Sequence, residues 1–254
     1  MIKVIKVGGG IIEKEENLNL FLDSFSKIKG PKILVHGGGR LATKMAAQLG
    51  YKSKMIEGRR VTDEKMLDVV TMVYGGLTNK KIVASLQAKG TNALGLSGAD
   101  GNTVLAHKRP VEKIDYGWVG DIDAINSELL ISLIKNNTVP VIAPLSHDGK
   151  GNILNTNADT MASEIAKELA QKEETQLILG FELNGVLKDI NDKSSAIKKI
   201  TPDLFKTLKS EGIISEGMIP KLSNAFDAVN AGVSSVIICD ALRIGENEGT
   251  IISK

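Results

Sequence analysis

The chain has 254 residues, of which 42% are hydrophobic and 24% charged, and its formal net charge at pH 7 is +2. This composition is that of an ordinary globular protein, and the small net charge with scattered lysines argues against a nucleic-acid partner. The single cysteine, Cys239, excludes an intramolecular disulfide, and no apolar run approaches the about 20 residues that cross a bilayer. We therefore expect a cytoplasmic protein without a membrane partner.

Short apolar runs alternate with amphipathic segments along the chain. The runs predict strands at residues 2–7, 32–36, 92–96, 139–143, 176–179 and 235–239, and helical spacing predicts helices at residues 40–49, 63–89, 159–171 and 221–231. Most of these strands are continuously apolar, which is typical of parallel strands covered on both faces. The alternation predicts an α/β fold, a three-layer α/β/α sandwich with a mainly parallel open central sheet.

Two segments interrupt this alternation. Residues 109–125 are rich in glycine and aromatic residues and predict an inserted hairpin. Residues 167–175 are charged and helical, so we place a boundary between two lobes there, at residues 1–172 and 173–254. Thr62 is the predicted N-cap of the helix at residues 63–89.

Two of the predicted strands end in glycine triplets, at residues 8–10 and 37–39. One triplet alone fits a tight turn, but two after successive strands favour an anion site formed by free backbone N–H groups. Neither triplet matches the Walker pattern or the G-x-G-x-x-G fingerprint, which argues against P-loop kinases and Rossmann dehydrogenases. Lys6 lies two residues before the first triplet, in an apolar strand where a buried ammonium group requires an anionic partner.

Two further polar features precede predicted helices. The stretch from Asn155 to Asp159 fits either a helix N-cap or a polar site at the carboxyl end of a strand. Lys221 is either a solvated lysine or a cation at a helix N-terminus, where it opposes the helix dipole unless an anion lies between them. Together with Lys6, these residues indicate a site for a phosphorylated ligand.

The ordered motifs resemble those of acetylglutamate kinases from one end of the chain to the other. The resemblance is carried by Lys6-Val7-Gly8-Gly9, His36-Gly37-Gly38-Gly39, Gly58-Arg59-Arg60-Val61-Thr62, Asn79-Lys80, Gly95-Leu96-Ser97-Gly98, Val119-Gly120, Asn155-Thr156-Asn157-Ala158-Asp159, Gly217-Met218-Ile219-Pro220-Lys221 and Gly249-Thr250. It implies the amino-acid kinase fold, with the acyl-amino acid on the N-terminal lobe and ATP on the C-terminal lobe. It also implies phosphorylation of the γ-carboxylate of N-acetyl-L-glutamate in arginine biosynthesis.

The resemblance also implies roles for individual residues. Lys6 and Lys221 would stabilise the transferring phosphoryl group, and Asp159 would orient both lysines. The substrate would be bound by Gly38, Gly39, Arg60, Asn155 and Asn157, with Arg60 and Asn155 on its α-carboxylate and amide. The phosphates and ATP would be bound by Gly8, Gly9, Glu182, Asn184, Gly185, Gly217 and Met218. We predict no metal site built from protein ligands, because Mg²⁺ is expected to arrive with ATP.

A carboxylate acceptor is already ionised near pH 7 and needs no general base. The expected site of lysines and backbone N–H groups therefore agrees with phosphoryl transfer by positioning and charge neutralisation. The histidines, His36, His107 and His147, are scattered in sequence, and none is expected to be a base or metal ligand.

The sequence departs from the family pattern at residues 181–185 and at its N-terminus. Where the family usually shows Thr-Asp-Val-x-Gly, this chain has Phe181-Glu182-Leu183-Asn184-Gly185, so the threonine is lost and the acid is longer. We expect ATP binding to survive with rearranged base or ribose contacts. The chain begins directly in its first strand, which resembles the short, arginine-insensitive, homodimeric members.

Three alternatives remain open at this point. The acyl group could be succinyl rather than acetyl, since the pocket wall cannot be read from the sequence. A sister kinase of the same fold would act on aspartate, aminoadipate or carbamate, although Arg60 in its Gly-x-Arg-Val-Thr setting favours an acylglutamate. A non-catalytic amino-acid sensor is disfavoured, because Lys6, Asp159 and Lys221 are all retained.

Overall fold

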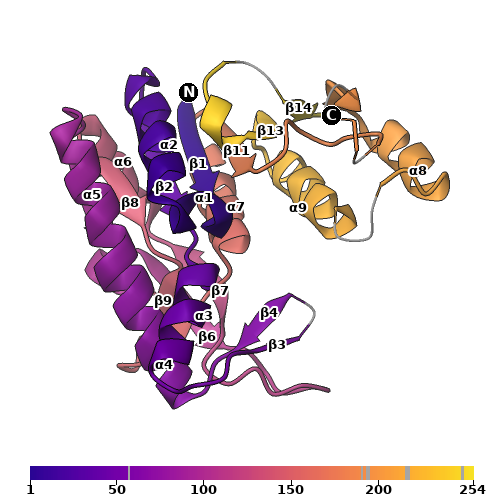
Figure 1. Cartoon of the computed structure of the whole chain (residues 1–254). Helices are drawn as coiled ribbons and strands as arrows, with labels where there is room; N and C mark the ends of the chain where they lie inside the picture. Colours follow the sequence, from indigo (N-terminus) through magenta and orange to yellow (C-terminus); the bar gives the residue numbers. More distant parts are fainter. Residues whose placement is uncertain (57, 190, 193–194, 215–217, 247–248) are drawn as a thin grey trace. The chain divides into compact units, whose positions relative to one another are not determined.

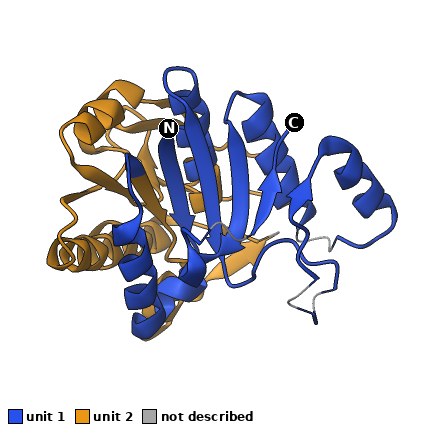
Figure 2. Cartoon of the chain, turned by 90° about the horizontal axis from the view of Figure 1, so that it is seen from above, with its two compact units in different colours: residues 1–32, 162–254 blue, residues 33–161 orange. Residues whose placement is uncertain are grey.

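A computed structural model of the chain consists of two compact units (Figure 2). The structure describes residues 1–254 except 57, 190, 193–194, 215–217 and 247–248. The first unit comprises residues 1–32 and 162–254, and the second comprises residues 33–161. The boundary between the expected lobes, 1–172 and 173–254, rests on the composition of residues 167–175, and this division stays a prediction.

The first unit is built on a mainly parallel sheet in which β11 (Thr175–Phe181) lies between β1 (Ile2–Val7) and β13 (Ser235–Asp240) (Figure 1). Strand β14 (Thr250–Ile252) pairs in antiparallel fashion with β13. On its other side it pairs in parallel with β12 (Lys199–Ile200). Its helices are α1 (Gly9–Glu13), α2 (Glu15–Lys27), α8 (Pro202–Ser210), α9 (Ile219–Asn230) and the 3-10 turn η4 (Ala241–Arg243). Helix α9 packs against β13 and β14, so its first turn lies beside this sheet.

The second unit holds a parallel sheet of β2 (Lys32–His36), β8 (Val139–Ile142) and β5 (Ala93–Leu96). Its helices are α3 (Gly39–Gln48), α4 (Glu64–Val70), the π-helix η1 (Thr71–Thr78), α5 (Asn79–Ala88), η2 (Asp100–Asn102) and α6 (Ser127–Lys135). A second sheet has the order β10 (Ile153–Asn155), β9 (Leu145–His147), β6 (Val104–Lys108) and β7 (Gly120–Ile125). A hairpin is formed by β3 (Lys54–Ile56) and β4 (Arg59–Val61). Helix α7 (Ala158–Ala170) contains the boundary between the units.

The predicted strands are confirmed, because each apolar run coincides with an observed strand to within a few residues. Every residue of β2 is buried, and Val4, Ile5 and Val7 of β1 are fully buried. Such continuous burial is what a parallel strand covered on both faces requires. An antiparallel hairpin is present as the pair β6–β7, but the predicted range is partly wrong, because the first arm, Val104–Lys108, lies entirely before residue 109.

Two details of the predicted helix at residues 63–89 are wrong. The N-cap is Asp63, whose carboxylate accepts from the Met66 N–H at 2.8 Å, and not Thr62. The segment is also divided by the π-helix η1, which contains Gly75 and Gly76. Glycine has weak helix propensity, and wide turns of this kind inside α-helices are frequent at functional sites.

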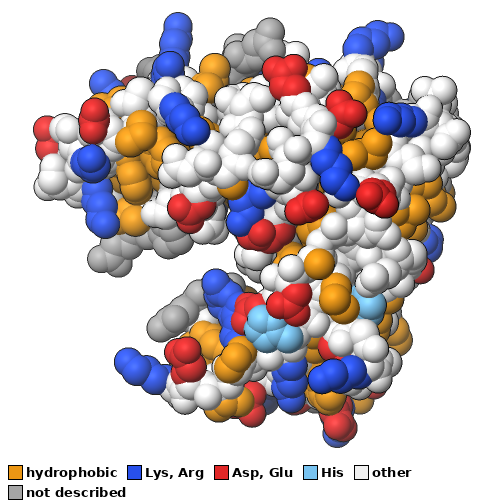
Figure 3. Space-filling view, turned by 180° about the vertical axis from the view of Figure 1, so that it is seen from behind, with side chains coloured by type: hydrophobic (Ala, Val, Ile, Leu, Met, Phe, Trp, Pro, Cys, Tyr) orange, Lys and Arg blue, Asp and Glu red, His pale blue; other side chains and the backbone are white. Residues whose placement is uncertain are grey.

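Charged side chains of both signs are interspersed on the face drawn in Figure 3, which agrees with the scattered lysines of the sequence. Among the helices of the described residues, none combines the length and the apolar character needed to cross a membrane.

Cys239 on β13 is 4% exposed, and burial raises the pKa of its thiol to about 12. Because the thiolate is the reactive form, we expect no reaction with a disulfide reagent such as Ellman's while the chain is folded. In concentrated guanidinium chloride one thiol per chain should react. Rapid modification of the folded protein would contradict the buried position of Cys239.

Candidate active site

The second glycine loop leads directly into α3. Gly38 and Gly39 lie at the N-terminus of this helix, and the Ala42 N–H donates to the Gly38 carbonyl at 2.9 Å. A Cβ atom on Gly38 would lie 2.8 Å from Cδ1 of Tyr74, whose ring is buried. The loop therefore needs glycine here because an aromatic ring from η1 packs directly against its backbone.

Arg60 is 7% exposed, and its guanidinium group is held by several neutral partners. Its Nη2 donates to the Gly39 carbonyl and to the Thr43 hydroxyl, both at 2.8 Å, and its Nη1 donates to the Ser53 hydroxyl at 2.7 Å. Burial raises the pKa of Tyr74, and a hydrogen bond with Arg60 opposes that shift. The contacts bring the predicted residues Arg60 and Gly39 together and fix a planar, fork-shaped cation beside the glycine loop.

Asn155 is joined to Arg60 through Thr62. The Asn155 Nδ2 donates to the Thr62 hydroxyl at 2.9 Å, and that hydroxyl donates to the Arg60 carbonyl at 3.1 Å. The main chain reinforces the link, since Trp118 donates to the Thr62 carbonyl and Asn155 donates to the Trp118 carbonyl. This use of the Thr62 hydroxyl explains why Asp63, and not Thr62, caps α4. We name Gly38, Gly39, Arg60, Thr62 and Asn155 the arginine cluster.

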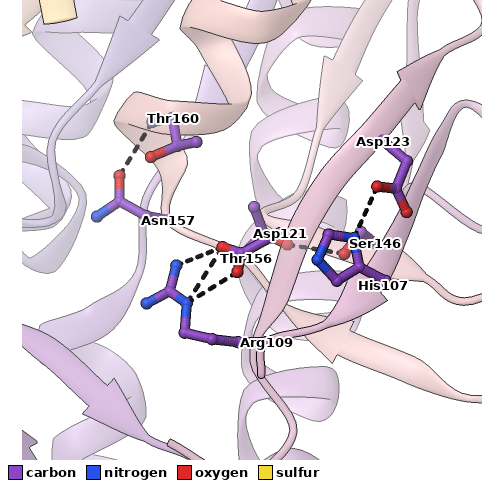
Figure 4. A network of polar contacts seen from close by, with 8 residues as sticks. All are labelled: His107, Arg109, Asp121, Asp123, Ser146, Thr156, Asn157 and Thr160. Carbon is purple, nitrogen blue, oxygen red and sulfur yellow. Dashed lines mark hydrogen bonds and ion pairs between the residues drawn. The ribbon is translucent and has the colours of Figure 1, made fainter. Parts of the chain in front are cut away.

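Asn157 directly precedes α7 and lies beside Thr160 (Figure 4), and Asp159 is the second residue of the helix. Oδ1 of Asn157 accepts from the Asp159 N–H at 2.8 Å and from the Thr160 N–H at 3.0 Å, so Asn157 caps the helix. The neighbouring Thr156 hydroxyl lies 2.7 Å from the Ser146 hydroxyl, which ties this turn to β9. Asp159 belongs to the second unit, whereas Lys6 and Lys221 belong to the first. Its orienting role therefore stays a prediction.

The other residues of Figure 4 form ion pairs on β6 and β7. Arg109 donates from Nε and Nη2 to Asp121, and this hydrogen bonding lowers the pKa of the Asp121 carboxyl group. His107 Nδ1 lies 2.7 Å from Asp123, and both side chains are well exposed. An exposed pair such as His107–Asp123 contributes little stability.

His36 is fully buried behind the glycine loop. Its Nδ1 lies 2.7 Å from the Gly37 carbonyl, which can only accept, so Nδ1 carries the proton. Nε2 is then the acceptor for Asn79 Nδ2 at 3.2 Å, and the same amide group donates to the Val141 carbonyl at 2.9 Å. Burial lowers the pKa of His36 to about 4, opposed by the hydrogen bond to the Gly37 carbonyl and helped by the nearby Lys80 ammonium group. His36 is thus a neutral support for the loop.

The buried His36 should make stability depend on pH. Its pKa falls from 6.5 to about 4 on folding, so below pH 6.5 the unfolded chain binds a proton that the folded chain does not. The unfolding free energy should therefore fall by about 3 kcal/mol between pH 6.5 and 4 through this residue. Urea unfolding at several pH values should show this component in the wild type and not in His36→Gln.

The surface residue His107 offers a matched control for that measurement. The His107→Gln variant should keep the pH-dependent component of the unfolding free energy, because the His107 imidazole that it removes is exposed in the folded wild type. Identical pH profiles for the wild type and His36→Gln would show that His36 is not held neutral.

In the first unit, Lys6 and Lys221 converge on one aromatic ring. The Nζ of Lys6 lies 4.7 Å from the ring centroid of Phe181, and that of Lys221 lies 4.0 Å from it. Lys6 is 6% exposed. A Cβ atom on Gly8 would lie 3.7 Å from Nζ of Lys6 and 3.6 Å from the Gly180 carbonyl. Two residues predicted to be catalytic therefore share one site with the first glycine loop. We name Lys6, Phe181 and Lys221 the lysine cluster.

The other predicted ATP residues differ in their surroundings. Glu182 is exposed, and Gly9 begins α1. Gly185 is buried at φ +142°, where a Cβ atom would lie 2.6 Å from the Thr250 hydroxyl. The Thr250 hydroxyl accepts a hydrogen bond from the Val186 N–H and donates one to the Ile197 carbonyl. Gly185 therefore leaves room for hydrogen bonds that hold β14 in place.

Two predicted residues lie at the start of α9, and one more follows β11. Met218 directly precedes α9, and Gly217 lies outside the described residues. Asn184 is half-buried in the turns that follow β11.

The sequence of the chain is similar to known proteins over nearly its whole length. A model of the amino acid kinase family matches residues 1–240. The chain belongs to the amino acid kinase family. The resemblance to acetylglutamate kinases is confirmed, since the enzyme of that name from Phocaeicola vulgatus is 57% identical over 253 residues, covering 100% of this chain and 98% of the relative.

Solved structures show the fold of this member of the amino acid kinase family. The crystal structure of smu.665 from Streptococcus mutans UA159 matches with a TM-score of 0.79 at 30% identity, covering 99% of this chain and 98% of that one. Carbamate kinase from Giardia lamblia bound to AMP-PNP matches with a TM-score of 0.72 at 15% identity, covering 100% and 98%. The predicted α/β fold class is confirmed.

The sequence does not indicate every residue that supports the arginine cluster and the lysine cluster. It gives no sign of Ser53, Thr43 and Tyr74, which contact Arg60, because nothing in their spacing links them to it. It singles out Phe181, but as a departure from the family pattern and not as a contact of the lysines. The sequence signal for a group contacting Lys6 was the position of this lysine in a buried strand, since its ammonium group needs a nearby partner.

Proposed function

We propose that this chain is an acetylglutamate kinase, which transfers the γ-phosphoryl group of ATP to the γ-carboxylate of N-acetyl-L-glutamate in arginine biosynthesis. The observation that carries the proposal is the 57% identity with an acetylglutamate kinase over the whole chain. The two clusters support it, because one presents a guanidinium group and amides while the other presents two ammonium groups.

The arginine cluster is suited to an acylated amino acid. The Arg60 fork is matched to the planar α-carboxylate, and the Asn155 amide is matched to the acyl amide of the substrate. In this proposal Gly38 and Gly39 receive the γ-carboxylate at the start of α3, where free N–H groups favour negative charge. Asn157 adds its amide from the α7 turn.

The lysine cluster is suited to a triphosphate. Its ammonium groups neutralise charge on the transferring phosphoryl group, and Gly8 and Gly9 leave room for close approach of phosphate oxygens. Glu182, Asn184, Gly185, Gly217 and Met218 are proposed to line the nucleotide side. Mg²⁺, when it is bound with ATP, neutralises further charge on the phosphate oxygens. Asp159 orients the two lysines in this proposal.

No general base is required, because the γ-carboxylate is ionised near neutral pH. The residues of this chain position the two reactants and stabilise the charge that develops between them.

A hydroxamate assay tests the proposal directly. The purified chain, ATP and Mg²⁺ are incubated with N-acetylglutamate, N-succinylglutamate, aspartate, aminoadipate or carbamate, and hydroxylamine traps acyl phosphates where they form. ADP release is measured in parallel for every substrate. We expect turnover with N-acetylglutamate to exceed that with the others, since sister kinases such as carbamate kinase are far less similar to this chain. Absence of acyl phosphate from N-acetylglutamate would refute the proposal.

We further propose a cytoplasmic homodimer, a two-lobe division of ligand binding at residue 172, and insensitivity to arginine. The homodimer and the insensitivity to arginine rest on the family resemblance, and the lobe division rests on the composition of residues 167–175. Light scattering tests the dimer, and addition of arginine to the assay tests the regulation.

A further inference from the structure

Phe181 occupies a particular place in the sheet of the first unit. In the parallel pair β1–β11, Lys6 is opposite Leu179, and Phe181 follows Leu179 by two residues. Residues two apart on a strand face the same side of the sheet, so Phe181 is the diagonal neighbour of Lys6 on that face. The strand pairing alone therefore places the ring beside the Lys6 side chain.

Lys221 reaches the same ring from a different element. It lies in the first turn of α9, which packs against β13 and β14. Its Nζ is 4.0 Å from the ring centroid, and Nζ of Lys6 is 4.7 Å from it. Both distances are within the about 6 Å over which an aromatic ring attracts a cation.

Two ammonium groups beside one ring are close enough to repel each other. The negative face of an aromatic ring attracts both of them, which opposes that repulsion. Leucine has no such quadrupole and could not replace this attraction.

We propose that Phe181 is a positioning residue of the phosphoryl-transfer site, whose ring holds the Lys6 and Lys221 ammonium groups where the phosphate arrives. This inference rests on the proposed function. It assigns a purpose to the aromatic residue at the point where the sequence departs from the family pattern.

Steady-state kinetics of three variants test the role. Phe181→Leu keeps the apolar bulk without the ring and should lower kcat about tenfold, with KM for N-acetylglutamate changed less than about twofold. Phe181→Tyr keeps the ring and should restore most of the loss. Phe21→Leu removes a fully buried ring elsewhere in the first unit, so it should lower thermal stability and leave kcat unchanged.

A spectroscopic readout tests the contact without relying on activity. Because Nζ of Lys6 and of Lys221 lies over the ring, the protons of the adjoining ε-methylene groups should resonate upfield in spectra of ¹³C-lysine-labelled protein. The Lys6→Arg and Lys221→Arg variants assign the two signals. Both upfield shifts should disappear in Phe181→Leu and persist in Phe181→Tyr and Phe21→Leu.

The two readouts separate the possible failures. An active wild type with an unchanged kcat in Phe181→Leu would overturn the positioning role, as would lysine signals that do not move in that variant. An inactive wild type would overturn the proposed function and the catalytic part of the inference, while the lysine signals would still decide whether the ring holds the ammonium groups.

Discussion

Replacing Lys6 with arginine should lower kcat by about 10²–10³-fold while KM for N-acetylglutamate stays nearly unchanged. The size follows from losing one charge-stabilising donor in a preorganised site. Arginine keeps the positive charge, but its planar group is larger than the ammonium that now lies beside Gly8 and the Phe181 ring. The interaction is made mainly in the transition state, so its loss appears in kcat and not in KM.

The same strand supplies a control for this substitution. Lys3 is half-buried on β1, and its Nζ donates to the Lys29 carbonyl at 3.3 Å, away from the lysine cluster. Lys3→Arg should therefore leave both kinetic constants unchanged. If Lys6→Arg turns over at the rate of Lys3→Arg, the role assigned to Lys6 is wrong.

Replacing Arg60 with lysine should raise KM for N-acetylglutamate by about 10–100-fold, with a much smaller change in kcat. Lysine keeps the positive charge but lacks the planar guanidinium group that matches a carboxylate. Charge-assisted arginine–carboxylate pairs contribute a few kcal/mol. The variant also loses hydrogen bonds to Gly39, Thr43 and Ser53, so we expect about 1–3 kcal/mol less stability. KM for ATP should not change, because Arg60 is assigned to the other substrate.

The adjacent residue is the matched control. Arg59 is exposed on the same short strand, and Arg59→Lys should change neither KM nor the melting temperature. Thermal unfolding of both variants separates the loss of stability from the loss of binding. A normal KM in a folded Arg60→Lys variant would remove Arg60 from the substrate site.

Most of the fold was predictable, because burial on both faces leaves a continuous apolar run in each parallel strand. Such runs identified β1, β2, β8 and β13 directly. Short strands such as β12 and β14 have too few residues to show a period. The π-helix η1 could not be predicted either, since Gly75 and Gly76 indicate a weak point in a helix but not which kind of turn forms there.

The candidate site was predictable to a different degree in its two halves. Glycine loops and buried lysines have a strong local signal, because few other residues suit those positions. Thr62 shows the limit of such signals. Its sequence position favours an N-cap, but its hydroxyl joins Arg60 to Asn155, which lie far apart in the chain.

The sequence by itself determined the residue types of the site and the order of its motifs, and these identified the chemistry of an anion site. Only the tertiary structure decided which residues meet. The register of β1 and β11 placed Phe181 beside Lys6, and the packing of η1 placed Tyr74 against Gly38. Such contacts depend on distances between segments far apart in the chain, which no local pattern of residues specifies.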